Sequence, residues 1–173
     1  MEEDVQFAHY DPNVASLMQL GKWFDYMREN GVYDNTRIIL VADHGRGLYL
    51  NWDRVIDNGP DTDFFFPLLM VKDFNAKGFS FSDTFMTTAD VPTLATSGLI
   101  DNPTNPFTGN AINANAKYDR PFYAFMSYDW DTSKNNGNQF FPGTWYRVDN
   151  QNARDKRNWV MVGENTVLPD ALR

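Results

Sequence analysis

The sequence predicts an α/β fold in which a mostly parallel central sheet is flanked by helices and a small antiparallel element lies at the C-terminal end. Three observations predict it. An amphipathic helix precedes a short apolar strand, a second apolar strand and a second helix follow, and the last third is rich in aromatic residues separated by turn residues. We divide the chain into two parts, residues 1–110 and residues 111–173. Both parts are expected to belong to one domain, since a length of 173 residues is typical of a single domain.

The first helix is expected at residues 13–30, where apolar side chains recur at helical spacing. Asp11 is its expected N-cap, Pro12 its first residue and Gly31 its end. One face of this helix carries the apolar residues Val14, Leu17, Met18, Gly21, Phe24 and Met27.

Two buried strands are expected next. The segment Arg37–Ala42 is apolar at every position after the first, which is typical of a parallel strand covered on both faces. Residues 64–71 predict the second strand, in which Pro67 indicates an edge position or a bulge. A short helix should follow Asp90 and end at Gly98, and aromatic segments at 121–128, 140–148 and 158–164 predict an antiparallel meander or hairpin.

The composition excludes several classes of function. A net charge of −8 without a run of Lys or Arg argues against a nucleic-acid partner. The absence of cysteine rules out disulfides and a thiolate nucleophile. The acidic N-terminus is unlike a signal peptide, and no apolar run approaches the ~20 residues of a membrane span, so we expect no signal or transmembrane segment in this chain.

The first predicted strand ends in Asp43-His44-Gly45, and ligands in open α/β sheets gather at the carboxyl ends of strands. A carboxylate oxygen and an imidazole nitrogen together suit Zn, Mn or a related cation. The alternative is local: Asp43 caps a turn through backbone hydrogen bonds, and His44 is a polar residue at a strand end. For an isolated Asp-His pair this alternative is the better interpretation.

The pair does not stand alone in the sequence. It follows residues 23–26 (Trp-Phe-Asp-Tyr), residues 31–36 (Gly-Val-Tyr-Asp-Asn-Thr) and the apolar strand, and residues 85–94 come later. This combination resembles the C-terminal half of the sulfatase and alkaline phosphatase superfamily. It is most similar to the bacterial branch of membrane-anchored sulfatases and lipoteichoic-acid-synthase-like phosphoglycerol transferases, over roughly residues 11–109.

The resemblance implies an alkaline-phosphatase-like fold, present in part, in which Asp43 and His44 hold a divalent cation (Mn, Mg, Ca or Zn). It also implies that His9 and Arg46 contact the substrate, a small anionic ester or a lipid- or glycan-linked phosphate or sulfate. Arg46 as a surface loop residue and His9 as a solvated histidine stay open as alternatives. The choice between sulfate and phosphate stays open as well.

Members of this family supply the nucleophile and another metal ligand from an N-terminal half that precedes the matched segment. We therefore expect this chain to be a C-terminal portion that has no catalytic nucleophile and is inactive alone. Ser16 and Thr36 carry hydroxyls, but one lies in the predicted helix and the other precedes the strand. The parent protein is expected in the cell membrane, with its catalytic domain outside the cytoplasm.

A second hypothesis is a non-catalytic binding or interaction module that keeps the fold and holds a glycan or a protein. Three tryptophans, Trp130, Trp145 and Trp159, could stack on sugars, although aromatic residues in a β-rich region more often form its core. The acidic pairs Asp61/Asp63 and Asp129/Asp131 are expected in solvated loops. Unpaired strand edges and exposed apolar surface also predict a homo-oligomer.

Overall fold

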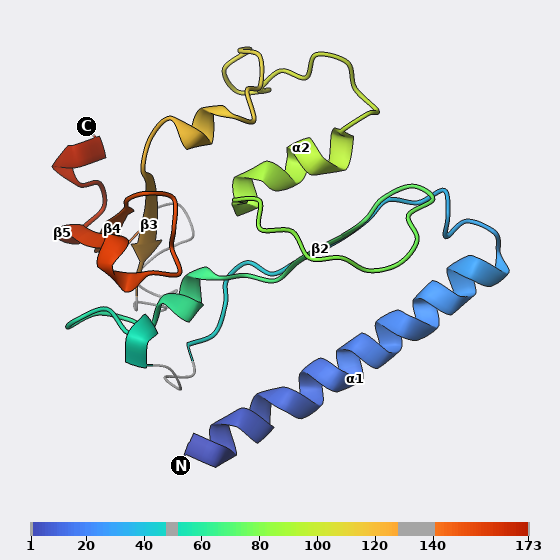
Figure 1. Cartoon of the computed structure of the whole chain (residues 1–173), viewed down its shortest axis with the longest axis horizontal. Helices are drawn as coiled ribbons and strands as arrows, with labels where there is room; N and C mark the ends of the chain where they lie inside the picture. The colour runs from blue at the N-terminus through green and yellow to red at the C-terminus, as the bar shows by residue number, and fades with distance from the viewer. Residues whose placement is uncertain (1, 48–51, 128–140, 173) are drawn as a thin grey trace.

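The computed structural model describes residues 2–47, 52–127 and 141–172, and the side chains of residues 2–9, 52 and 171 lie outside this description. The described chain contains a long helix α1 (Glu2–Glu29), a short helix α2 (Val91–Thr96) and five strands. The strands are β1 (Ile38–Val41), β2 (Leu69–Lys72), β3 (Phe122–Met126), β4 (Gly143–Val148) and β5 (Trp159–Thr166). Figure 1 shows β3, β4 and β5 at one end of the molecule and α1 running away from them.

The prediction of a mostly parallel central sheet flanked by helices is wrong. The five strands form a two-stranded sheet, β1-β2, and a three-stranded sheet, β3-β4-β5, and every pairing is antiparallel. Parallel neighbours need a long crossover, usually a helix, to bring the chain back to the same end of the sheet. The described part of the connection from β1 to β2 contains no α-helix, but the short 3-10 turns Trp52–Arg54 and Thr62–Phe65 and an isolated bridge between Val55 and Asp61, and β2 returns antiparallel to β1.

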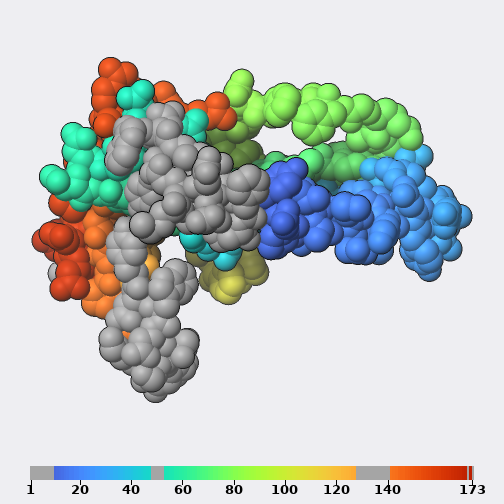
Figure 2. Space-filling view, turned by 90° about the horizontal axis from the view of Figure 1, so that it is seen from below, coloured from blue at the N-terminus to red at the C-terminus, as the bar shows by residue number. Residues whose placement is uncertain are grey.

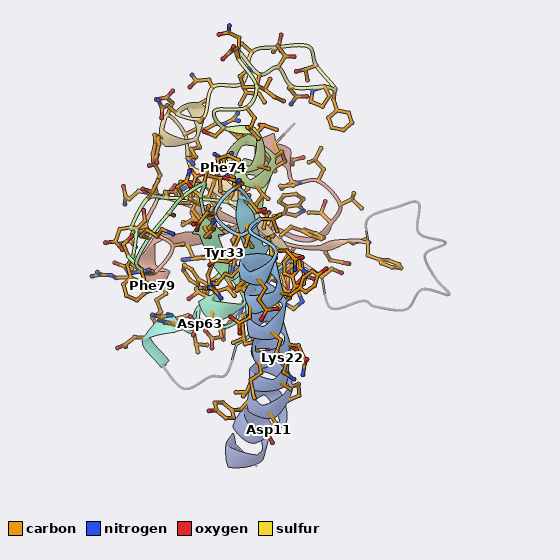
Figure 3. All side chains as sticks on the ribbon, turned by 90° about the vertical axis from the view of Figure 1, so that its right-hand side faces the viewer. Asp11, Lys22, Tyr33, Asp63, Phe74 and Phe79 are labelled. Carbon is orange, nitrogen blue, oxygen red and sulfur yellow. The ribbon has the colours of Figure 1, made fainter. Side chains whose placement is uncertain are left out.

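The α1 helix is longer and more exposed than its sequence pattern suggested. It runs through Pro12, which was expected to be its first residue, and ends before Gly31, whose φ of +68° matches the expected stop. Of the expected apolar face, Met27 is buried, whereas Leu17 and Met18 are 55% and 62% exposed. The helix is anchored at its C-terminal end, and Figure 3 follows it from Asp11 and Lys22 toward Tyr33.

The contacts at that end are aromatic and cationic. Phe24 packs edge-to-face on Tyr33, with ring centroids 5.8 Å apart, and the Arg28 guanidinium lies 4.2 Å from the Tyr33 ring centroid. The Lys72 ammonium donates to the carbonyls of Tyr33, Asp34 and Thr36, which ties the end of β2 to the turn after α1. Along the described helices, none is long and apolar enough to cross a membrane.

The α2 helix is where the sequence pattern put it, with Gly98 at a φ of +72° beyond its end. Arg37 fixes that end, because its Nη1 lies 2.7–3.1 Å from the carbonyl oxygens of Leu94, Ala95 and Ser97. At the other end, burial raises the pKa of Asp90, but the Thr87 N–H and the Lys117 ammonium outweigh it. The pKa of Asp90 therefore lies below its usual value.

The buried core lies in the C-terminal meander, which forms as the aromatic segments predicted. Ala124, Tyr146, Val148 and Trp159 are its buried residues. Phe65 reaches this core from the segment before β2, and its ring centroid lies 4.8 Å from that of Trp159. Figure 2 shows the same gathering, with residues 52–66 packed beside the C-terminal strands at one end.

Candidate functional site

The Asp-His-Gly segment follows β1 directly. The last ladder bond between the two strands runs from the Ala42 N–H to the Leu68 carbonyl at 3.0 Å. One carboxylate oxygen of Asp43, Oδ1, then accepts the His44 N–H at 2.9 Å, and His44 Nδ1 lies 2.7 Å from the Gly45 carbonyl oxygen. Both side chains therefore make the local bonds of a turn at a strand end, as the local alternative expects.

Glycine is required at position 45 because the turn presses against the segment before β2. The Gly45 N–H donates to the Phe64 carbonyl at 2.9 Å. A Cβ atom on Gly45 would lie 2.6 Å from the Phe66 carbonyl oxygen and still closer to that of Asp63. Both obstacles are backbone atoms, which cannot rotate away. Since Phe65 belongs to the aromatic core, this contact fixes the Asp-His turn to the most buried part of the molecule.

Within the described residues, the local bonds leave one possible ligand atom of each side chain without a hydrogen bond. A carbonyl oxygen can only accept, so His44 Nδ1 carries the proton toward Gly45 and His44 Nε2 presents its lone pair. Asp43 Oδ2 lies 3.8 Å from His44 Nε2, and the two side chains are 91% and 57% exposed. Two ligands at about 2.0–2.2 Å from one tetrahedral ion lie about 3.4 Å apart, which is close to the separation of these two atoms.

This donor set fits half of a metal site. Within the described residues, no group of three or more His, Cys, Asp or Glu side chains is close enough to hold a metal ion. The hydroxyls weighed as nucleophiles are engaged elsewhere: Ser16 Oγ donates to the Pro12 carbonyl and Thr36 Oγ1 to the Val32 carbonyl, both at 2.8 Å. The described residues therefore supply two carboxylate or imidazole ligands at this turn and no third one beside them.

The two other predicted site residues lie in different environments. Arg46 is exposed and follows the turn, and it lines the same hollow of the surface as Asp43 and His44. His9 lies in the first part of α1, and its side chain is outside the described atoms. The structure therefore brings three of the four predicted residues to one surface.

The hollow itself is wide and open. Its volume is about 2470 Å³, and its walls include β2, the residues after it up to Thr88, and the Asp43–Arg46 turn. Pockets for small molecules usually measure ~300–1,000 Å³, so this hollow is larger than one small ligand needs. Figure 2 shows α1 and the segment leading to α2 as two arms projecting to the same side.

The acidic and tryptophan residues considered as further candidates mostly stabilise the fold. Asp61 was expected in a solvated loop, but it is 1% exposed, and its carboxylate accepts the Asp63 N–H at the start of a 3-10 turn. Asp63 in turn pairs with Arg54. Trp159 is 6% exposed and belongs to the core, while Trp145 packs on Phe125 at 4.9 Å between ring centroids. Trp130, Asp129 and Asp131 lie outside the described residues.

The close approach at Gly45 could not be predicted from the sequence, because the general freedom of glycine in turns does not imply it. Comparisons with known proteins do not identify a family, because no family model, curated protein or solved structure matches the chain. The resemblance to the sulfatase and alkaline phosphatase superfamily therefore stays a prediction that rests on residues 11–109.

Proposed function

We propose that this chain supplies two metal ligands, Asp43 and His44, to an enzyme that cleaves or transfers phosphate or sulfate esters, as its resemblance to the sulfatase and alkaline phosphatase superfamily implies. The geometry of two possible ligand atoms supports this proposal. Asp43 Oδ2 and His44 Nε2 are exposed, lie 3.8 Å apart and lead into the same hollow.

Each residue of the turn has a definite part in this proposal. The Gly45 carbonyl holds His44 in the tautomer whose Nε2 can bind a cation, and the His44 N–H orients the Asp43 carboxylate. When bound, a divalent cation would polarise the ester oxygen and stabilise the charge that develops on it. Arg46, exposed two residues beyond His44, could meet an anionic oxygen of the ester.

The charges around the hollow favour an anionic ligand. Over the whole chain, 23 acidic residues outnumber 15 basic ones. Among the described residues the lining reverses this balance, since its acidic side chains are Asp34, Asp43 and Asp83 and its basic ones are Arg28, Arg46, Lys72, Lys77 and Arg154. A phosphate or sulfate ester would therefore meet less repulsion here than the net charge of the chain suggests.

Titration calorimetry with Zn²⁺ and Mn²⁺ tests the proposal on the purified chain. Two ligands should give one weak site, and Asp43→Ala or His44→Ala should weaken binding about tenfold or more, since each removes half of the donor set. Asp83→Ala is the matched control, because Asp83 lines the same hollow and its side chain is 97% exposed. His9→Ala controls for binding at the other histidine.

The outcomes are distinct. Equal binding by wild type and Asp43→Ala, or equal loss in Asp83→Ala and Asp43→Ala, would contradict the proposal. Without its nucleophile the isolated chain should not turn over aryl sulfates or phosphate esters with any of these cations. Turnover that Asp43→Ala abolishes would show that a nucleophile lies within these 173 residues.

The hollow favours a second candidate, a non-catalytic module that binds a protein or a glycan. Its size exceeds that of a small-molecule pocket, and apolar side chains such as Leu68 and Val71 stand exposed on its wall at 52% and 45%. Absence of cation binding together with retained folding would favour this candidate over the metal half-site.

A further inference from the structure

The alternation of hydrogen-bonded and non-hydrogen-bonded pairs along the β1-β2 sheet determines which backbone groups point outward. The Ala42 N–H donates to the Leu68 carbonyl, and Leu40 pairs with Met70 in the same register. In an antiparallel ladder, hydrogen-bonded and non-hydrogen-bonded pairs alternate. The backbone groups of Leu40 and Met70 therefore point into the ladder, whereas those of Ile39 and Val41 on β1, and of Leu69 and Val71 on β2, point away from it.

These outward groups are unpaired. The sheet has two strands, so both strands are edges, and none of the four outward residues hydrogen-bonds to other described residues through its outward N–H or C=O. A two-stranded ribbon is only marginally stable in water, and an open edge is a template for another strand. What the edge lacks is the backbone of a further strand.

β2 carries more exposed side chains than β1. Met70 and Val71 are 40% and 45% exposed, and Leu68 just before the strand is 52% exposed. On β1, Ile38 is only 8% exposed, and Val41 is 44% exposed. All of β2 lines the hollow, whose lining also includes three residues of β1 and residues 76–88.

We propose that the β2 edge pairs antiparallel with the β2 edge of a second copy of this chain, which joins two ribbons into one four-stranded sheet, β1-β2-β2-β1. Outward residues must face each other, so a two-fold axis at Met70 places Leu69 opposite Val71 of the second copy. Each such pair exchanges two N–H···O=C bonds, which gives four bonds across the axis.

The flanking residues are compatible with this register. Lys72 falls opposite Leu68 of the second copy and Asp73 opposite Pro67, so no like charges meet across the axis. The Lys72 ammonium is already held by the carbonyls at the end of α1, and Asp73 is paired with Arg37. The proposed interface therefore buries apolar side chains and backbone groups without placing like charges opposite each other.

Proline substitutions test whether β2 pairs through its outward N–H groups, because proline has no backbone N–H. Val71→Pro removes an outward N–H and leaves the ladder to β1 intact, because the bonds of that ladder belong to the neighbouring residues. It should weaken dimerisation about tenfold or more in sedimentation velocity, since two of the four bonds across the axis are lost. Val71→Ala keeps the N–H and should dimerise more tightly than Val71→Pro.

Ile39→Pro is the matched control, because it removes an outward N–H from the other edge of the same ribbon. It should leave dimerisation unchanged. Amide exchange of the wild-type chain gives a second readout that needs no variant: protection of the Leu69 and Val71 amides should rise with chain concentration, and that of Ile39 and Val41 should not. A wild type that stays monomeric at every concentration, or an equal effect of both prolines, would overturn the inference.

Discussion

Replacing Trp159 with alanine should lower the free energy of unfolding by about 3–5 kcal/mol, the usual cost of removing a large aromatic side chain from a core. Trp159 is 6% exposed and contacts the rings of Phe65, Phe122 and Tyr146. Its indole N–H also donates to the Ala153 carbonyl at 2.8 Å, which the substitution would leave without this partner. Urea denaturation followed by circular dichroism measures the loss.

Met161→Ala provides the matched control for this prediction. Met161 lies on the same strand, β5, but is 55% exposed. Its truncation should change the free energy of unfolding by less than about 0.5 kcal/mol, as is usual for surface substitutions. Equal losses in the two variants would mean that the C-terminal meander does not hold the principal core.

Gly45→Ala should destabilise the chain by about 1–3 kcal/mol or more, because the added Cβ meets backbone oxygens rather than a movable side chain. Relief requires the Asp43–Gly45 turn to move away from residues 63–66. The same variant should therefore also weaken any cation binding at Asp43 and His44. Thermal unfolding and Zn²⁺ titration measure the two effects.

The matched control is Gly21→Ala. Gly21 lies within α1, and a Cβ there would meet nothing within 4 Å. Alanine should stabilise this helix by about 0.5–1 kcal/mol, since it has the higher helix propensity. A Gly45→Ala variant as stable as wild type would show that the turn does not press against the segment before β2.

Local signals in the sequence predicted the elements better than their arrangement. The end of α1 shortly before Gly31, the position of α2 and the antiparallel C-terminal segments follow from turn chemistry and residue spacing, which act within a few residues. The direction of β2 does not, because a continuous apolar run is typical of a parallel strand, yet the apolar strand Ile38–Val41 pairs antiparallel with β2.

Burial was also hard to predict from pattern alone. The run Ile38–Val41 reads as a strand covered on both faces, yet Val41 is 44% exposed. Leu17 and Met18 recur at helical spacing on α1 and still face solvent. Apolar periodicity shows which side chains favour a partner surface, but it does not show whether the described residues supply that surface.

The position of Asp43 and His44 after a strand was predictable from the sequence, whereas their local hydrogen bonds were not. Asp43 and His44 follow β1 as expected, and Arg46 lines the same hollow. The tautomer of His44 and the orientation of Asp43 depend on hydrogen bonds to Gly45 and to the His44 N–H, which depend on backbone geometry. For Asp61 the prediction of a solvated loop residue was wrong. Its carboxylate is buried and caps the 3-10 turn Thr62–Phe65.

Metal binding by Asp43 and His44 can be followed directly in a long-range ¹H–¹⁵N correlation spectrum of the two histidine rings during titration with Zn²⁺. The geometry predicts that His44 Nδ1 is protonated and that His44 Nε2 alone shifts on binding, with the shift lost in Asp43→Asn. His9 should not respond. A spectrum in which His44 Nε2 stays unchanged, or in which both histidines respond alike, would contradict the assignment of Asp43 and His44 as a metal-binding pair.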